Sequence, residues 1–420
     1  MNNKAKRIVV TGLGTVTPYG VGVKSFWDNI KAGKSCISNK TTLYDNINNP
    51  VKICGEYVDF NPELYLDAKD AKRFDRYVQF GLIASDEAVK DAGINADNTD
   101  ENRFGVIVGS GSGGLMTVQK SHLEMINKGP ARCTPFTVPM MIVNMAAGLI
   151  GLRHNARGKN IAVVSACATA GHSIGEAARS IFYGDADVMI AGASEAAICD
   201  ISMGAFCAAR TLSKNVEFPE KASRPYDKDR NGFVMSEAAG LLVLEELEHA
   251  KKRGAKIYAE LIGYGSSCDA YNMVAPEPEG NGAAKAMQNA LDDANIKPEE
   301  VDYINTHGTS THVGDIAEIK GILKVFGEHA LSGNLAISST KSMHGHALGA
   351  SGGIEAIACI MAMQENIVPP TINLDNPDEE IPKSLNLVPN KAQKKTLNVV
   401  MSNSYGFGGQ NVSLIFKRFE

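Results

Sequence analysis

The sequence predicts an α/β protein built from two similar halves, residues 1–255 and 256–420, that pack as one unit. Three observations support this prediction. Apolar runs typical of buried strands alternate with helix-like stretches, which implies sheets covered on both faces. Six segments of the first half recur in the second half in the same order. No stretch rich in Pro, Gly or Ser separates the halves, so nothing indicates a flexible linker between them.

The repeated segments define the expected elements in order. An opening strand and the end of a helix recur first, followed by four further strands. The pairs are 6–14 with 256–265, 88–94 with 290–296, 104–111 with 303–309, 161–166 with 335–340, 187–192 with 398–402, and 240–244 with 412–416. Each half is therefore expected to run strand, helix, strand, helix, strand, strand. Insertions near 115–150 and 204–235 decorate the first half, and long insertions are often functional.

Composition excludes several classes of protein. A net charge of −5 argues against general affinity for nucleic acid, and 44% hydrophobic with 21% charged residues is typical of a soluble globular chain. Eight cysteines without paired CxxC spacing fit neither a zinc module nor a disulfide scaffold. The N-terminus lacks the pattern of a signal peptide, and no run approaches the roughly 20 apolar residues of a membrane span. We therefore expect a cytoplasmic protein without a membrane or nucleic-acid partner.

Cys167 is the strongest candidate for a nucleophile. It lies between the apolar run 161–166 and a helix-like stretch, which places its sulfur at a strand-to-helix turn. Free backbone N–H groups and the helix dipole at such a turn favour the thiolate, the nucleophilic form of cysteine. Most cysteines in proteins are buried and inert, and the other seven here have no comparable context.

Two histidines are expected to meet Cys167. In a duplicated fold, the helix after the central strand of one half meets its counterpart from the other half. The segment 341–355, which contains His346, occupies that second position, and His307 follows another strand of the second half. The repeat therefore brings Cys167, His307 and His346 to one site, as nucleophile-plus-base chemistry requires.

At these residues the chain resembles the elongating (type II) branch of the β-ketoacyl-ACP synthases. The resemblance runs nearly end to end and rests on VTGLG at 10–14, SACA at 165–168, SRPYD at 223–227, THGTST at 306–311, TKSM at 340–343, GHALG at 345–349 and NSYGFGG at 403–409. It implies the duplicated thiolase fold, a five-layer α-β-α-β-α sandwich, and a dimer.

The resemblance also implies a reaction. An acyl chain moves from an acyl carrier protein (ACP) to the cysteine. Malonyl-ACP then loses CO2, and its carbanion attacks the thioester to give a 3-oxoacyl-ACP two carbons longer. A thiolate both attacks and leaves readily, and two histidines can stabilise the developing enolate. This chemistry needs no metal and no cofactor beyond the phosphopantetheine of the ACP, and the sequence holds no metal or cofactor motif.

The resemblance assigns roles residue by residue. Cys167 is the nucleophile, His307 and His346 are the active-site histidines, Lys341 orients and tunes them, and Glu355 supports the site from the next helix. Phe407 is the gate, and its backbone N–H joins that of Cys167 in the oxyanion hole. Thr309 and Thr311 contact the pantetheine arm of the substrate, and Ser112 and Phe206 line the acyl pocket.

Carrier proteins are acidic, so a net-negative enzyme needs a local positive patch to attract one. The positions that resemble the docking residues of the family are Lys69, Lys72, Arg73, Arg132 and Arg210. The alternative is an ordinary solvated face, which is what most charge clusters are.

Several positions depart from the usual pattern. Asn272, Val274 and His312 stand where elongating synthases usually carry His, Thr and Pro, and His344 is interpreted as a neighbour of the catalytic His346. These departures keep open a specialised polyene or polyketide synthase, paired with a chain-length factor instead of forming a homodimer. A thiolase is less favoured because the C-terminal turn lacks a second cysteine. A silent partner subunit is less favoured because such subunits lose the nucleophile.

Overall fold

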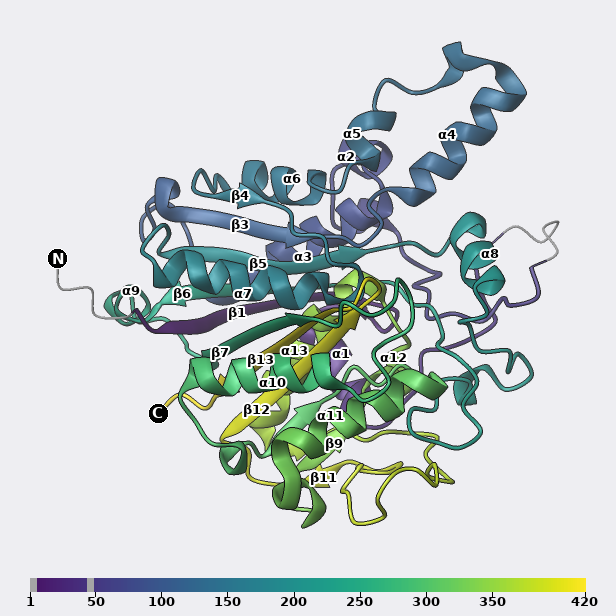
Figure 1. Ribbon diagram of the computed structural model, residues 1–420. Helices are drawn as coiled ribbons and strands as arrows, with labels where there is room; N and C mark the ends of the chain where they lie inside the picture. The colour runs from purple at the N-terminus through teal and green to yellow at the C-terminus, as the bar shows by residue number, and fades with distance from the viewer. Residues whose placement is uncertain (1–5, 44–48) are drawn as a thin grey trace.

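The computed structural model describes residues 6–43 and 49–420, and its elements stack as five layers (Figure 1). Helices α3 (Arg76–Ala92) and α6 (Met145–His154) cover the outer face of the first half's sheet. Helices α7 (Thr169–Phe182) and α13 (Ser351–Glu365) form the central layer. Helices α10 (Asn281–Ala294) and α11 (His312–Leu331) cover the sheet of the second half. The predicted α-β-α-β-α sandwich is confirmed.

The strands repeat the same spatial order in both halves. The first half contributes β4-β3-β5-β6-β1, and the second continues as β7-β13-β12-β8-β9. Their bounds are β1 Ile8–Thr17, β3 Phe104–Gly109, β4 Asn160–Ile161, β5 Val188–Glu195 and β6 Ala238–Glu246, then β7 Ala259–Cys268, β8 Tyr303–Asn305, β9 Ala336–Ser338, β12 Val399–Gly406 and β13 Gln410–Lys417. The halves join where β1 and β7 pair over three residues, Ile8–Val10 against Ala259–Leu261.

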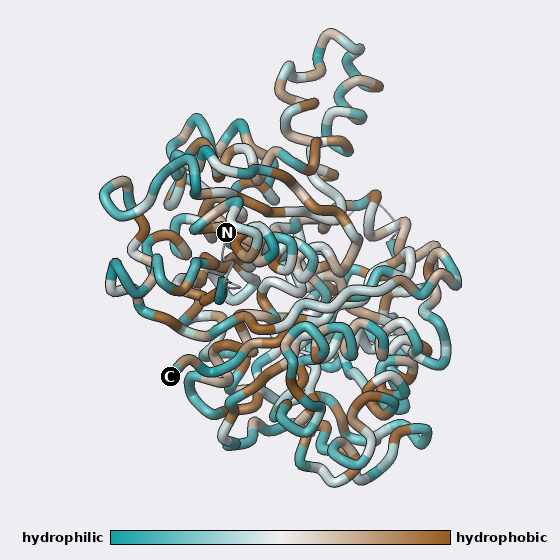
Figure 2. Tube along the Cα trace, turned by 60° about the vertical axis from the view of Figure 1, so that its left-hand side comes forward, coloured by the Kyte–Doolittle hydropathy of each residue, from teal (hydrophilic) through white to brown (hydrophobic). Residues whose placement is uncertain are grey.

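The remaining elements decorate this core. They are β2 Gly20–Val21, α1 Val23–Lys31, α2 Ala68–Arg73, α4 Leu115–Lys128, α5 Thr137–Met141, α8 Asp200–Ala208, α9 Leu247–Lys252, α12 Lys341–His344, β10 Ile367–Val368 and β11 Gln393–Lys394. Helices α4 and α5 project from the body of the molecule (Figure 1). Figure 2 shows hydrophobic residues concentrated along the central strands and also scattered on this projection.

The central layer explains why the active-site segments can approach each other. Nearly every residue of α13 is buried, as expected for a helix that is apolar all round. A Cβ built on Gly352 of α13 would lie 3.2 Å from the backbone nitrogen of Gly171 on α7. Glycine at this crossing therefore lets the two helices, and the turns that precede them, pack in close contact.

Three expectations about the repeat were wrong in detail. Each half contains one strand and one helix more than the predicted order strand, helix, strand, helix, strand, strand. The insertion expected at 115–150 overlaps α6, which is a core helix that matches α11. The segment 161–166 is not a buried strand: β4 is two residues long and exposed. It pairs with β3 alone among the described strands and so forms the sheet edge.

Across residues 6–43 and 49–420, no helix combines the length and apolar character needed to cross a bilayer.

Candidate active site

The candidate active site is a cavity of about 480 Å³ where the two halves meet. Cys167 from the first half faces this cavity together with His307 and His346 from the second. The predicted convergence of these three residues is therefore present in the structure. The cavity also contacts Ser112, Phe206, Thr309, Thr311, Phe407 and Arg210.

Cys167 sits in a single 3-10 turn, Ala166–Ala168, directly before α7. The turn is tight, because Ala166 has a φ of +49°, a region that non-glycine residues rarely occupy. The Thr169 hydroxyl braces the turn: it donates to the carbonyl of Ala166 at 2.7 Å and accepts from the amide of Ser165 at 2.9 Å. This backbone strain turns the sulfur out of the helix layer and into the cavity.

The charge state of Cys167 differs from the sequence-based expectation. Burial raises the pKa of the Cys167 thiol to about 12, and nearby Glu195 adds to this rise. The Lys341 ammonium and the backbone N–H groups of Phe407 and Cys167 act in the opposite direction but do not offset burial. The helix start was expected to favour the thiolate, but the pKa of Cys167 is raised and not lowered. Desolvation at this partly enclosed position outweighs the helix dipole, and Cys167 rests as a thiol.

The two histidines form an adjacent pair. Their ring centroids lie 5.3 Å apart with planes at 86°, an edge-to-face arrangement. Burial, with help from the Lys341 charge, holds the pKa of both imidazoles well below the usual value. Both rings are therefore neutral at physiological pH. His346 Nδ1 lies 3.0 Å from the Ser351 hydroxyl, and a tautomer that accepts from this hydroxyl carries its ring proton on Nε2.

Lys341 and Glu355 form a buried ion pair behind the histidines. The Lys341 ammonium donates to Glu355 Oε1, and the two side chains are 1% and 0% exposed. Neither residue contacts the cavity. His344, interpreted from the sequence as a neighbour of His346, is also fully buried: its Nε2 lies 3.0 Å from the Thr340 hydroxyl and 4.0 Å from Glu355 Oε1. His344 therefore packs beside the ion pair and not in the reaction space.

The structure also splits the segment 341–355, which was expected to be the counterpart helix. Residues Lys341–His344 form α12, and the true counterpart α13 begins at Ser351. His346 lies in the connection, directly after Gly345, whose φ of +70° suits glycine. The helix break is what frees the His346 ring to face the cavity.

Sequence reasoning missed Glu318, which lies on α11 and contacts the cavity. Its carboxylate accepts from the backbone amides of His307 at 2.9 Å and Gly308 at 2.8 Å, so it fixes the loop that carries His307. Burial raises the pKa of Glu318 to about 7. The available signal was the pair Asp315 and Glu318, which share one face of the helix that follows the HGTST motif.

Glu195 is a second missed residue. It is fully buried and accepts from Ser110 and Ser112 on one side and from the amide of Gly349 on the other, at 3.1 Å for the last. It thus ties the predicted acyl-pocket residue Ser112 to the segment that follows His346. An isolated glutamate in an apolar run gives no sequence signal for this role.

An aromatic cluster borders the cavity at Cys167. Phe206 contacts Phe233 at a centroid distance of 5.4 Å and Phe407 at 6.3 Å, and Phe233 contacts His346 at 5.4 Å. Phe407 is 37% exposed and lines the cavity, as a gate beside Cys167 would. The sequence did not single out Phe233.

The departures lie at the cavity mouth. Val274 and His312 line the cavity. Asn272 instead folds back on its own loop, where its side chain accepts from the amides of Val274 at 2.9 Å and Ala275 at 3.0 Å. Two of the departures thus change the lining, whereas the Asn272 side chain bonds within its own loop.

The predicted docking residues fall in three places. Lys69, Lys72 and Arg73 lie on α2, where the two lysines are exposed and Arg73 stacks on the ring of Phe136 at 4.6 Å. Arg132 is exposed on the turn between α4 and α5, in the projection beside α2 (Figure 1). Arg210 stands apart at the cavity itself.

Comparison with known proteins agrees with this site. Residues 5–250 match the model for the N-terminal domain of β-ketoacyl synthases, and residues 258–375 match the model for their C-terminal domain. The chain is 47% identical to 3-oxoacyl-(acyl-carrier-protein) synthase 2 of Synechocystis sp. over 100% of both chains. It is 48% identical to the Vibrio cholerae protein of the same name, over 98% of this chain and 99% of that protein.

Solved structures give the same result. A type II PKS acyl-carrier protein in complex with its ketosynthase bound to the hexaketide matches with a TM-score of 0.90 at 34% identity, over 99% of this chain and 100% of that one. The ishigamide ketosynthase/chain length factor matches with a TM-score of 0.90 at 32% identity, with the same coverage. With both domain models and full-length relatives in agreement, the chain belongs to the β-ketoacyl synthase family and is an acyltransferase of the thiolase fold.

Proposed function

We propose that the protein is a 3-oxoacyl-ACP synthase that extends an acyl chain by two carbons through decarboxylative Claisen condensation. The observation that carries the proposal is the meeting of Cys167, His307 and His346 in one cavity, each from a different segment of the fold. A single nucleophile beside two neutral imidazoles suits a reaction that needs both a covalent acyl carrier and hydrogen-bond donors for an enolate.

The first half-reaction acylates the cysteine. The Cys167 sulfur attacks the thioester carbonyl of acyl-ACP, and the tetrahedral oxyanion accepts hydrogen bonds from the N–H groups of Cys167 and Phe407, the same groups that lower the pKa of the Cys167 thiol. The carbon–sulfur bond to the carrier breaks, and the proton of the Cys167 thiol ends on the released pantetheine thiol. A resting thiol means that this proton must move during acylation.

The second half-reaction forms the carbon–carbon bond. Malonyl-ACP loses CO2, and the enolate oxygen accepts hydrogen bonds from the neutral rings of His307 and His346. Its carbon then attacks the acyl-Cys167 carbonyl, and collapse of the tetrahedral intermediate expels the Cys167 thiolate, which takes up a proton. Lys341 acts through the histidines, because its positive charge adds to burial in lowering their pKa, while its pairing with Glu355 limits the cost of its own burial.

We further propose that the substrates arrive on the phosphopantetheine of an acidic ACP, with no metal or other cofactor. Support comes from the relatives, whose names include an acyl carrier protein, and from the exposed cations of α2 and Arg132. All eight cysteines are unpaired, which fits a reducing cytoplasm.

A dimer is also proposed, with contact along the edge strand β4. Ile161 on this strand is 41% exposed and Val164 just after it is 53% exposed. Unpaired strand edges with apolar side chains favour association with a second sheet. Val164→Lys should convert a dimer to monomer in analytical ultracentrifugation, whereas Leu64→Lys, at a residue 73% exposed elsewhere, should not.

The test of the reaction is product analysis. Purified protein supplied with acyl-ACP and malonyl-ACP should release one CO2 for each 3-oxoacyl-ACP formed, two carbons longer than the acyl donor. His346→Ala should retain acylation of Cys167 but lose condensation. Release of CO2 without any chain extension by the wild-type protein would contradict the proposal.

A second candidate is a ketosynthase of a specialised polyene or polyketide pathway that works with a chain-length factor. The full-length match to the ishigamide ketosynthase/chain length factor favours it. The higher identity to the synthase 2 proteins, 47–48%, favours the first candidate. Co-purification from the native host distinguishes them, because only the second requires a non-identical partner chain.

A further inference from the structure

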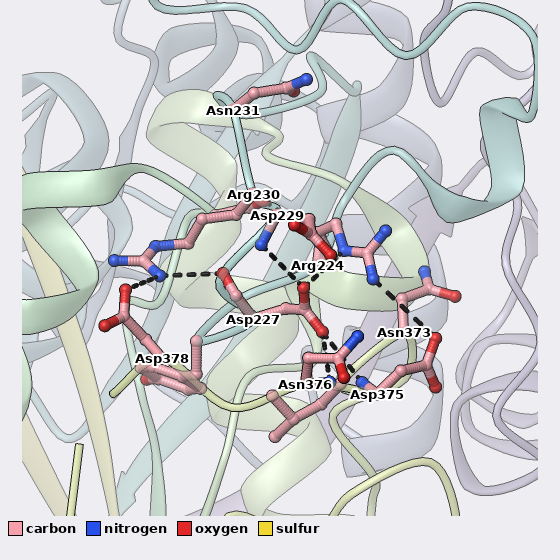
Figure 3. A network of polar contacts seen from close by, with 12 residues as sticks. Arg224, Asp227, Asp229, Arg230, Asn231, Asn373, Asp375, Asn376 and Asp378 are labelled. Atoms are coloured by element: carbon pink, nitrogen blue, oxygen red, sulfur yellow. Dashed lines mark hydrogen bonds and ion pairs between the residues drawn. The ribbon is translucent and has the colours of Figure 1, made fainter. Parts of the chain in front are cut away.

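One edge of the cavity, residues 309–312, is held from behind by a buried arginine. Arg230 is 1% exposed. Its guanidinium donates to the backbone carbonyls of two consecutive cavity residues, Thr311 at 3.1 Å and His312 at 2.8 Å. It also donates to the carbonyl of Asp227 at 2.8 Å (Figure 3). One side chain thus fixes the cavity edge to the segment that contains Arg230 itself.

Two carboxylates fix the orientation of this guanidinium. Asp378 accepts from Arg230 at 2.6 Å (Figure 3), and Asp315 on α11 lies 3.4 Å from it. Asp315 is fully buried. A buried cation is tolerated only with paired charges and satisfied donors, so the arginine has little freedom to move. The position of the cavity edge is therefore set by a rigid network.

The same network holds a strained residue. Ser310 has a φ of +71°, which is unfavourable for a residue with a Cβ. Its amide donates to Asp315 Oδ1 at 3.1 Å, its carbonyl accepts from Gly232 at 3.0 Å, and its hydroxyl accepts from the amide of Arg224 at 3.0 Å. Strain of this kind persists where the surroundings over-determine the backbone, and it is common beside substrate sites.

The strained backbone places two hydroxyls side by side. Thr309 Oγ1 and Thr311 Oγ1 lie 3.1 Å apart, and both residues line the cavity. We propose that Arg230 is a positioning residue for the thioester-bearing pantetheine arm: it holds Thr309 and Thr311 where their hydroxyls meet the amides of that arm. This inference rests on the proposed function. Arg230 itself would touch neither substrate nor the reacting atoms.

Lysine cannot fully replace Arg230. The planar guanidinium offers five N–H groups in a fixed fork, whereas an ammonium offers three from one atom. Arg230→Lys keeps the charge that Asp315 and Asp378 require but loses simultaneous support of both cavity-edge carbonyls. The expected consequence is a displaced cavity edge in a folded protein.

The experiment compares three reagents on Cys167 in the full-length protein: octanoyl-pantetheine, an octanoyl thioester of a short thiol without the pantetheine amides, and iodoacetamide. In Arg230→Lys, acylation by octanoyl-pantetheine should fall about 10- to 100-fold, mainly through a higher half-saturating concentration. The other two reagents should change by less than about 2-fold, because neither uses the arm. Arg253→Lys, at a partly buried arginine paired with Glu245 outside the cavity, serves as the control and should leave all three rates unchanged.

Two results would overturn the inference: an unchanged rate with octanoyl-pantetheine, or an equal loss with all three reagents, which would indicate general distortion. If Arg230→Lys does not fold, Asp378→Asn carries the test, since it retains the shape and weakens only the outer ion pair. A wild-type protein that iodoacetamide labels but neither thioester acylates would contradict the proposed function, and the inference with it. Acylation of the wild type with no loss in the variant would contradict the inference alone.

Discussion

His307 and His346 meet edge to face, 5.3 Å between ring centroids, although one follows strand β8 and the other lies in the break between α12 and α13. Both imidazole rings are neutral at neutral pH, because burial and the Lys341 charge lower the pKa of each ring. This pair can therefore donate hydrogen bonds to an enolate, or accept a proton, without first losing one.

The charge of Lys341 should be visible in the titration of both histidines. In Lys341→Met, the pKa of each ring should move upward, because the repelling cation is gone, yet stay below that of an exposed histidine, because burial is the larger cause. Histidine-selective NMR titration measures this directly. Unchanged titration in the variant would show that Lys341 does not tune the pair.

The same substitution should destabilise the protein, because it leaves Glu355 buried without its partner. We expect a loss of about 3–5 kcal/mol in the free energy of unfolding for Lys341→Met. Lys341→Met combined with Glu355→Gln should recover most of that loss, since the unpaired charge is removed as well. Denaturant unfolding of the two variants checks this, and equal stability of the single and double variants would exclude the ion-pair explanation.

The raised pKa of Cys167 predicts how its reactivity depends on pH. With a pKa of about 12, the thiolate fraction rises tenfold for each pH unit across pH 6–9, so alkylation by iodoacetamide should rise steadily without a plateau. Peptide mass spectrometry restricts the measurement to Cys167. A plateau below pH 8 would mean that the helix start stabilises the thiolate after all.

A substitution at Glu195 should change the pH dependence of Cys167 alkylation. Because its charge helps to raise the pKa of Cys167, Glu195→Gln should shift the whole alkylation profile toward lower pH. The amide keeps the size of the side chain beside Ser112 and Gly349. A profile that coincides with the wild type would remove Glu195 from the account of the nucleophile.

The cavity wall should control chain length. Phe206→Ala removes a ring from the lining, so the acyl chain found on Cys167 should lengthen by roughly two to four carbons, whereas Ser112→Ile should shorten it. Mass spectrometry of the protein incubated with a mixture of acyl-ACPs gives both distributions. Identical distributions in the two variants would mean that the acyl chain lies elsewhere.

Carrier docking should depend on the cations of α2. Lys72→Glu with Arg73→Glu should weaken use of acyl-ACP at least tenfold at low salt and less at high salt, and leave labelling by iodoacetamide intact. Because Arg73 also stacks on Phe136, Lys69→Glu with Lys72→Glu is the cleaner pair, since both side chains are exposed. Equal loss of both reactions would reject the docking assignment.

Much of this fold and site could be predicted from the sequence, because the segments of the first half recur in the second half in the same order. The repeated segments 6–14 and 256–265 located β1 and β7, and the motifs around Cys167, His307 and His346 located the cavity. The short exposed β4 was misread because an apolar run has the same composition at a sheet edge as in its centre. The resting charge of Cys167 was misread because a helix start is visible in sequence, whereas desolvation depends on what packs over it.

Two supporting residues could not be found from the sequence for a related reason. Glu195 and Arg230 act on backbone groups of segments far away in the chain, and backbone amides and carbonyls leave no mark in the sequence. Only the folded chain shows which loop each buried charge holds in place.

The most direct test of the central claim is rapid-quench intact-protein mass spectrometry during a single turnover with stoichiometric acyl-ACP, followed by malonyl-ACP. The account predicts one acyl group per chain, mapped to Cys167, that disappears as 3-oxoacyl-ACP forms, and no such adduct in Cys167→Ala. An acyl group on another residue, or product formed at the same rate by Cys167→Ala, would contradict it.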